Sequence, residues 1–127
     1  MTTRDLVNDI DLQTSLAPAA YTASTNGQGV DLRGFESAAI AFVAGTVTDG
    51  THTPSVEESD DGSAWSAVAA ADLDRSLANL ASGTVQRVGY RGAKRHLRAV
   101  LTVTGATTGA VATAVVVRGN AAQQPVA

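Results

Sequence analysis

The chain has 127 residues, a net charge of −3 and no cysteine. This length suits one domain with one core, and the lack of cysteine excludes disulfides, thiolate metal sites and cysteine nucleophiles. The acidic balance argues against a general attraction to nucleic acid. The N-terminal segment lacks the apolar stretch of a signal peptide, and no run is long enough to span a membrane. We therefore expect a soluble protein made in the cytosol, with no nucleic-acid or membrane partner.

Residues 1–18 differ from the rest of the chain. Leu6, Ile10 and Leu16 could line one side of a short helix, and this pattern ends at Pro18. A short helix and an extended arm both fit it, and either needs a surface to pack on. We expect three parts, namely an N-terminal arm (1–18), a folded domain (19–118) and a C-terminal tail (119–127).

The middle of the chain has the pattern of antiparallel strands, in which short apolar or alternating segments are separated by turn residues. Segment 37–45 has Ala39 and Val43 on one face and Ile40 and Phe42 on the other, which predicts a central strand. Further strands are expected at 20–25, 30–32, 54–59, 64–69, 84–92, 96–105 and 109–119. The predicted class is all-β, an antiparallel β-sandwich or jelly-roll-like single domain.

One internal segment has a helical pattern. In "AADLDRSLANLA" (70–81), Asp72 can act as the N-cap of a helix with three leucines at helical spacing. A long loop fits these residues as well. The choice between helix and loop stays open for the wider stretch 70–86.

Acidic residues gather in "TDGTHTPSVEESDDGSAW". Catalysis by paired carboxylates requires two of them to converge across a cleft, whereas Glu57 and Glu58 are neighbours on an expected strand and point to opposite faces. Asp60 and Asp61 precede a glycine, as in a tight turn. We expect solvated turn and strand residues, with no catalytic residue, no cofactor and no metal. A calcium site that also uses Asp49 stays open as an alternative.

A basic cluster, "YRGAKRHLR", contains Arg91, Lys94 and Arg95. Such a patch could bind nucleic acid with help from stacking on Tyr90. It could equally be a charged turn between strands that meets an acidic protein partner. The acidic net charge and the few aromatic residues favour the second interpretation.

Three segments, taken together, resemble a group of small proteins encoded among the head genes of long-tailed bacteriophages. They span roughly half of the chain in the same order, whereas "DRSLANLASGTVQ" (74–86) has no counterpart. The segments are "SLAPAA" (15–20), "TDGTHTPSVEESDDGSAWSAVAAADL" (48–73) and "RVGYRGAKRHLRAVLTVTGATTGAV" (87–111).

The resemblance implies a virion structural protein of the capsid decoration, or cement, type. Such a protein would be a homotrimer that binds the major capsid protein at threefold positions on the capsid surface, after assembly in the host cytoplasm. The expected contacts with the capsid or with other subunits are Leu6, Ile10, Leu16, Arg91, Lys94 and Arg95. Two alternatives remain: another virion component (head–tail connector, tail protein or head fibre base), and a carbohydrate-binding module with Trp65 and Tyr90 as stacking platforms.

Overall fold

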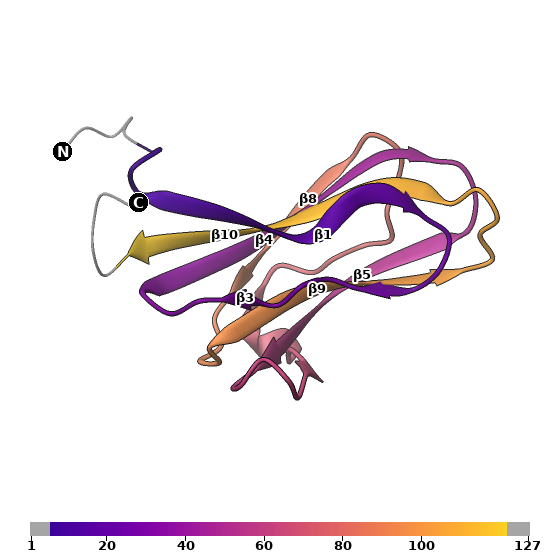
Figure 1. Cartoon of the computed structure of the whole chain (residues 1–127). Helices are drawn as coiled ribbons and strands as arrows, with labels where there is room; N and C mark the ends of the chain where they lie inside the picture. Colours follow the sequence, from indigo (N-terminus) through magenta and orange to yellow (C-terminus); the bar gives the residue numbers. More distant parts are fainter. Residues whose placement is uncertain (1–5, 122–127) are drawn as a thin grey trace.

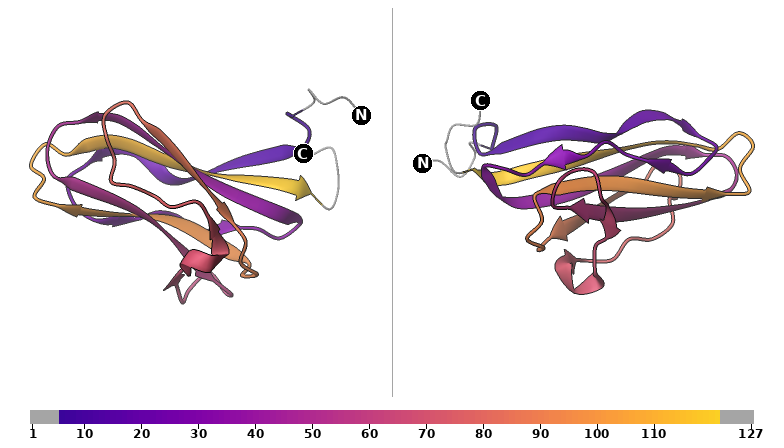
Figure 2. Two further views of the ribbon diagram at one scale, coloured as in Figure 1. Left: turned by 180° about the vertical axis from the view of Figure 1, so that it is seen from behind. Right: turned by 60° about the horizontal axis from the view of Figure 1, so that its bottom comes forward.

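The computed structural model describes residues 6–121, which form two antiparallel β-sheets packed face to face (Figures 1 and 2). The predicted all-β class is confirmed, and the architecture is a sandwich. The first sheet, called sheet A, has the strand order β1-β10-β4-β8-β7. Its strands are β1 (Ile10–Tyr21), β4 (Phe35–Val47), β7 (Leu73–Asp74), β8 (Val85–Tyr90) and β10 (Ala110–Ala121).

The second sheet, called sheet B, has the strand order β2-β9-β5-β6, and β3 also pairs with β9. Its long strands β5 and β9 are joined over nine residue pairs, from Thr51–Thr104 to Ser59–His96. The strands are β2 (Thr25–Asn26), β3 (Val30–Asp31), β5 (Thr51–Ser59), β6 (Ser66–Ala67) and β9 (His96–Thr104). Sheet B is thus built on one central pair, with three short strands at its borders.

Strand β4 is central in sheet A, as its two apolar faces predict. It pairs with β10 on one side and with β8 on the other. Ile40, Phe42 and Ala44 point inward and are almost fully buried. They meet inward side chains of sheet B such as Leu97 and Leu101 in a single core. Many of the core side chains are alanine and valine, so the two sheets pack on small side chains.

The predicted boundaries at both ends of the domain are wrong. Residues 10–18 belong to β1, which pairs with β10 along an edge of sheet A, and β10 itself continues to Ala121. Leu16 is 1% exposed, and the Ser15 hydroxyl accepts a 2.9 Å hydrogen bond from the backbone N–H of Ala99. This segment is therefore an integral strand, because its apolar side chain and polar groups are satisfied inside the sandwich. Residues 1–5 and 122–127 lie outside the described residues.

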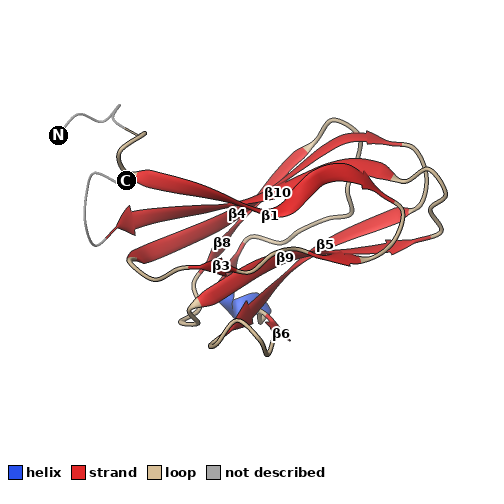
Figure 3. Cartoon of the chain, in the orientation of Figure 1, coloured by secondary structure: helices blue, strands red, loops and turns tan. Residues whose placement is uncertain are grey.

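The open question over 70–86 is resolved without an α-helix. Ala70–Asp72 forms one turn of 3₁₀-helix, called η1, and Leu73–Asp74 forms β7 (Figure 3). A loop follows, in which the N–H of Leu80 donates to the carbonyl of His52 and Leu80 is buried. Leu80 is therefore buried beside β5, whereas Leu73 lies in β7 of sheet A and Leu77 packs half-buried against the core, so helical spacing is not required.

Candidate functional site

The described chain begins and ends at one end of the sandwich (Figure 1). Most of the expected contact residues lie in segments that the strand register places at this end. Strand pairing fixes this position, because Ile10 lies opposite Gly119 and Gly119 lies opposite Ser37. Leu6 is 61% exposed beyond this edge, whereas Ile10 is half-buried. Leu16 is the exception, since it is buried in the core and cannot contact another protein. Its predicted contact role is wrong.

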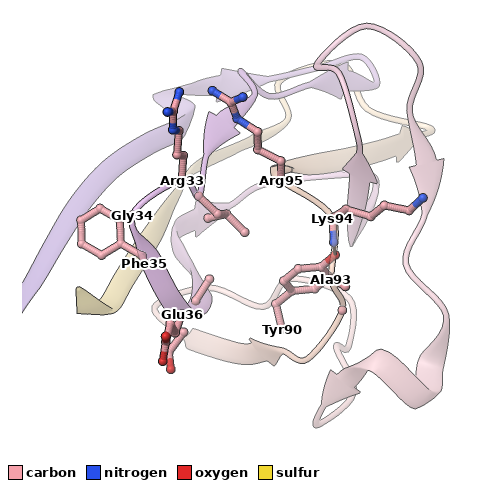
Figure 4. Close-up of a pocket in the computed structure, with 12 residues that line it drawn as sticks. Arg33, Gly34, Phe35, Glu36, Tyr90, Ala93, Lys94 and Arg95 are labelled. Atoms are coloured by element: carbon pink, nitrogen blue, oxygen red, sulfur yellow. Dashed lines mark hydrogen bonds between the residues drawn. The ribbon is translucent and has the colours of Figure 1, made fainter. Parts of the chain in front are cut away.

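A pocket of about 450 Å³ opens at this same end, between the β3–β4 loop and the β8–β9 loop (Figure 4). It forms where β4 and β8 stop pairing, since Ala38–Tyr90 is the last pair between them. Arg33 and Arg95 extend in a similar direction from its rim, whereas Lys94 points away from them. The pocket is lined by Leu32, Arg33, Gly34, Phe35, Glu36, Ser37, Ala38, Tyr90, Gly92, Ala93, Lys94 and Arg95.

Each basic residue predicted in this cluster has an acidic partner. The guanidinium of Arg95 binds both carboxylate oxygens of Asp31, at 2.9 and 2.7 Å. This contact lowers the pKa of Asp31 well below its usual range, and it raises the pKa of Arg95. The other two pairs are Lys94–Asp60 at 2.8 Å and Arg91–Asp74 at 3.1 Å. The cluster therefore carries much less net positive charge than its sequence indicates.

Arg33 is different, because its side chain has no ion-pair partner among residues 6–121. Its backbone N–H donates to Asp31, which fixes the start of the β3–β4 loop. Arg33 is exposed beside the pocket. The sequence gives no signal for Arg33, because this residue stands alone in "VDLRGF" and its closeness to Arg95 depends on the pairing of β3 with β9.

Tyr90 lines the pocket and fixes the loop beside it through hydrogen bonds. Its hydroxyl donates a 2.6 Å hydrogen bond to Glu58 and accepts one from the backbone N–H of Lys94 at 3.1 Å. Burial, followed by the bond to Glu58, raises the pKa of Tyr90 to about 12. Gly92 lies against this ring, and a Cβ there would come within 2.4 Å of the hydroxyl. The β8–β9 loop thus packs on Tyr90, which keeps the pocket in shape.

A further arginine, Arg118, lies largely buried at the same end of the sandwich. Arg118 of β10 is 16% exposed, pairs with Asp11 of β1 and donates to the carbonyl of Asp31 at 2.8 Å. Its guanidinium lies 4.5 Å from the centre of the Phe35 ring. Arg118 therefore ties four strands together. A lone arginine near the end of an apolar segment gave no sequence signal for this role.

The acidic stretch does not converge on one site. Asp49 precedes β5 and accepts backbone N–H bonds from residues 107–109 of the β9–β10 turn, the shortest at 2.7 Å from Gly109. Asp60 and Asp61 follow β5 at its far end. Asp61 accepts bonds from the N–H groups of Ser63 and Ala64, and these bonds lower its pKa to about 2. The carboxylates stabilise turns, as a solvated-turn interpretation predicts.

Residues 6–121 contain no group of three or more His, Asp or Glu side chains placed to hold a metal ion. The open alternative of a calcium site is also disfavoured by distance, since the nine-residue strand β5 separates Asp49 from Asp60 and Asp61. His52 is buried, and its Nε2 lies 3.0 Å from the carbonyl oxygen of Asp49. It therefore packs beneath the β4–β5 turn, to which Asp49 belongs.

The two aromatic residues considered for carbohydrate stacking do not form a common platform. Trp65 lies on the outer side of sheet B, where the guanidinium of Arg98 is 4.5 Å from its ring centre and Gly29 touches its edge. Tyr90 points between the sheets and packs against the core. A sugar ring would therefore have to displace Arg98 from Trp65, and it would find no second ring beside it.

The chain gives no match when it is compared with protein-family models, with curated proteins or with solved structures. No helix among the described residues is long and apolar enough to cross a membrane.

Proposed function

We propose that this protein is a structural component of a phage head, of the decoration type, which attaches to the outer surface of the major capsid protein. The sequence resemblance of residues 15–20, 48–73 and 87–111 supports this function. One structural observation supports it as well. The pairing of β1, β10 and β4 puts the exposed apolar side chains of Leu6 and Val7 at the same end as the pocket and Arg33.

This end has the properties that protein docking requires. Leu6 and Val7 are 61% and 79% exposed, so their burial against a partner is favourable. Arg33 supplies a positive charge that is not already paired within residues 6–121. A partner surface with an apolar groove and an acidic border would complement both features. Many copies attached in this way would bind a shell firmly, even when each single contact is weak.

The test uses particles purified from a phage in which this gene is deleted. Purified full-length protein is added back, and the bound amount is measured by co-sedimentation. We expect saturable binding that is weakened at least tenfold by Arg33→Glu combined with Val7→Asp. The matched control is Arg75→Glu combined with Thr53→Asp, which introduces the same charges at exposed positions away from this end and off the outer face of sheet A. Absence of binding by the unaltered protein would contradict the proposal.

A further inference from the structure

The outer face of sheet A is apolar across four neighbouring strands. Leu12, Val111, Val43 and Val85 on this face are 57%, 48%, 38% and 67% exposed. Strand register places Val43 directly opposite Val85, and Leu12 directly opposite Val117. Between them lie the half-buried side chains of Ala39, Ala41, Val115 and Val117, with Thr14 and Thr113 as uncharged polar neighbours. The outer face of an antiparallel sheet is usually polar, so this face has the character of a buried surface.

The outer face of sheet B has the opposite character. Its cross-strand pairs include Thr51–Thr104, Thr53–Thr102 and the ion pair Glu57–Arg98. These side chains hydrate readily, as expected for a face directed to water. The apolar outer face of sheet A is therefore not a general consequence of a chain rich in alanine and valine, because sheet B of the same chain has a polar outer face.

Charges on the apolar face occur at its β7–β8 edge. Arg87 of β8 and Arg91, the residue after β8, are each two residues from Gly89, and Asp74 of β7 pairs with Gly89. A Cβ on Gly89 would lie 3.2 Å from the Cβ of Asp74, so Asp74 is on the same face. Arg91 binds Asp74, whereas Arg87 has no ion-pair partner in the described part of the chain. This edge therefore carries two positive charges, from Arg87 and Arg91, and one negative charge, from Asp74.

We propose that a second copy of this chain covers the outer face of sheet A, with the two sheets stacked about a twofold axis. The outer faces of two copies are complementary to each other. Its centre has no charge, so two copies meet without burying an unpaired charge. An axis that crosses the strands between Arg87 and Asp74 sets Arg87 of each copy opposite Asp74 of the other. Such reciprocal contacts are what a twofold interface requires.

The size of the face fits a weak to moderate dimer. Four strands at the usual spacing are about 15 to 20 Å across, and residues 111–119 of β10 extend over about 27 Å. The projected area is roughly 400 to 500 Å², and the accessible area is larger because side chains make the surface uneven. A standard interface uses about 800 Å² on each partner. We therefore expect self-association with a dissociation constant in the micromolar range or above.

This inference is independent of the proposed capsid contact, which lies at the end of the sandwich and not on the face of sheet A. The test therefore uses the purified full-length chain alone. Its mass is measured by sedimentation equilibrium from the micromolar to the submillimolar range. We expect the mass to rise with concentration from the 12.8 kDa monomer to the dimer. Constant monomer mass, or a trimer, would overturn the proposal.

Face variants identify the surface. Val43→Glu should raise the dissociation constant at least tenfold. If the circular dichroism spectrum of Val43→Glu differs from that of the unaltered chain, Val85→Glu is used in its place and should have the same effect. The matched control is Thr53→Glu on the outer face of sheet B, which should leave association unchanged. Equal association of Val43→Glu, Val85→Glu and the unaltered chain would place the contact elsewhere and overturn the proposal.

A charge exchange tests the twofold arrangement itself. Arg87→Glu places like charges opposite each other and should weaken the dimer. Asp74 also binds Arg91 of its own chain, so Arg91→Gln is included in every variant of this series. Adding Asp74→Arg to Arg87→Glu then restores opposite charges across the axis and should recover part of the lost affinity. Failure of the double variant to recover any affinity would overturn the stated axis. If the chain stays monomeric but Val43→Glu abolishes binding to particles, the face belongs to the capsid contact and the dimer is wrong.

Discussion

The hydroxyl of Tyr90 in β8 donates a hydrogen bond of 2.6 Å to Glu58 in β5, so a single side-chain contact joins the two sheets at one end of the sandwich. The same hydroxyl accepts a bond from the backbone N–H of Lys94. The contact therefore links sheet A, sheet B and the loop that borders the pocket. Tyr90 therefore stabilises this end of the sandwich together with Arg118.

Replacing Tyr90 by Phe should destabilise the fold by about 1 to 2 kcal/mol, because it leaves Glu58 and the N–H of Lys94 without this partner. The free energy of unfolding in urea measures the effect. The matched control is Tyr21→Phe. Within residues 6–121 the Tyr21 hydroxyl bonds only to the nearby carbonyl of Ala17, so its loss should cost within about 0.5 kcal/mol. Equal losses in the free energy of unfolding for both variants would show that the Tyr90–Glu58 contact stabilises the fold no more than the local Tyr21–Ala17 contact does.

Alkaline pH should weaken the fold through Tyr90. Its pKa is raised from 10.0 to about 12, first by burial and then by the bond to Glu58. Below pH 10 the hydroxyl is protonated in both the folded and unfolded states, and its contribution is fully present. Between pH 10 and about pH 12 the unfolded state loses its proton first, so stability falls. The stability advantage of the unaltered chain over Tyr90→Phe should therefore shrink across this range. An advantage that stays constant to pH 12 would contradict the account.

Strand β1 should be essential for folding, although a detachable arm was expected there. Leu16→Ala removes a side chain that is 1% exposed and should cost about 2 to 5 kcal/mol. Leu6→Ala changes a side chain that is 61% exposed and should change the free energy of unfolding by within about 0.5 kcal/mol. Thermal or urea denaturation of both variants checks this difference. A stable Leu16→Ala variant would mean that the segment is an arm after all.

Trp65 is the single tryptophan and reports on the outer side of sheet B. A methyl group on Gly29 would come within 2.7 Å of its ring, so Gly29→Ala should push the ring away from Arg98 and shift its fluorescence to longer wavelength. Gly119→Ala is the control, since its nearest neighbour is Ile10 at 3.8 Å and it lies in sheet A. Identical spectra for both variants would contradict the described packing of Trp65.

The sequence predicted the strands best where apolar residues alternate without interruption. The two apolar faces of 37–45 identified the centre of sheet A, and 96–105 contains β9. The N-terminal strand was missed because register shifts after Thr14 and after Leu16 break the two-residue period. Without that period, the spacing of Leu6, Ile10 and Leu16 imitates a helix.

The candidate site was only partly visible in the sequence. The basic cluster was found, but its neutralisation was not, because its partners are distant in the chain. Asp31 and Arg95, for example, are 64 residues apart. The apolar face of sheet A was present in the pattern of β4 but was interpreted as burial inside the protein. A sequence gives the polarity of a strand face, whereas only the strand order shows whether another layer covers it.

The most direct test of the proposed decoration function is the copy number of this protein in purified phage particles. Quantitative mass spectrometry would measure it relative to the major capsid protein. The account predicts a ratio near one, or another simple fraction set by the capsid lattice. A handful of copies in each particle would place the protein at the portal, tail or vertices, and complete absence from the particles would contradict a virion role.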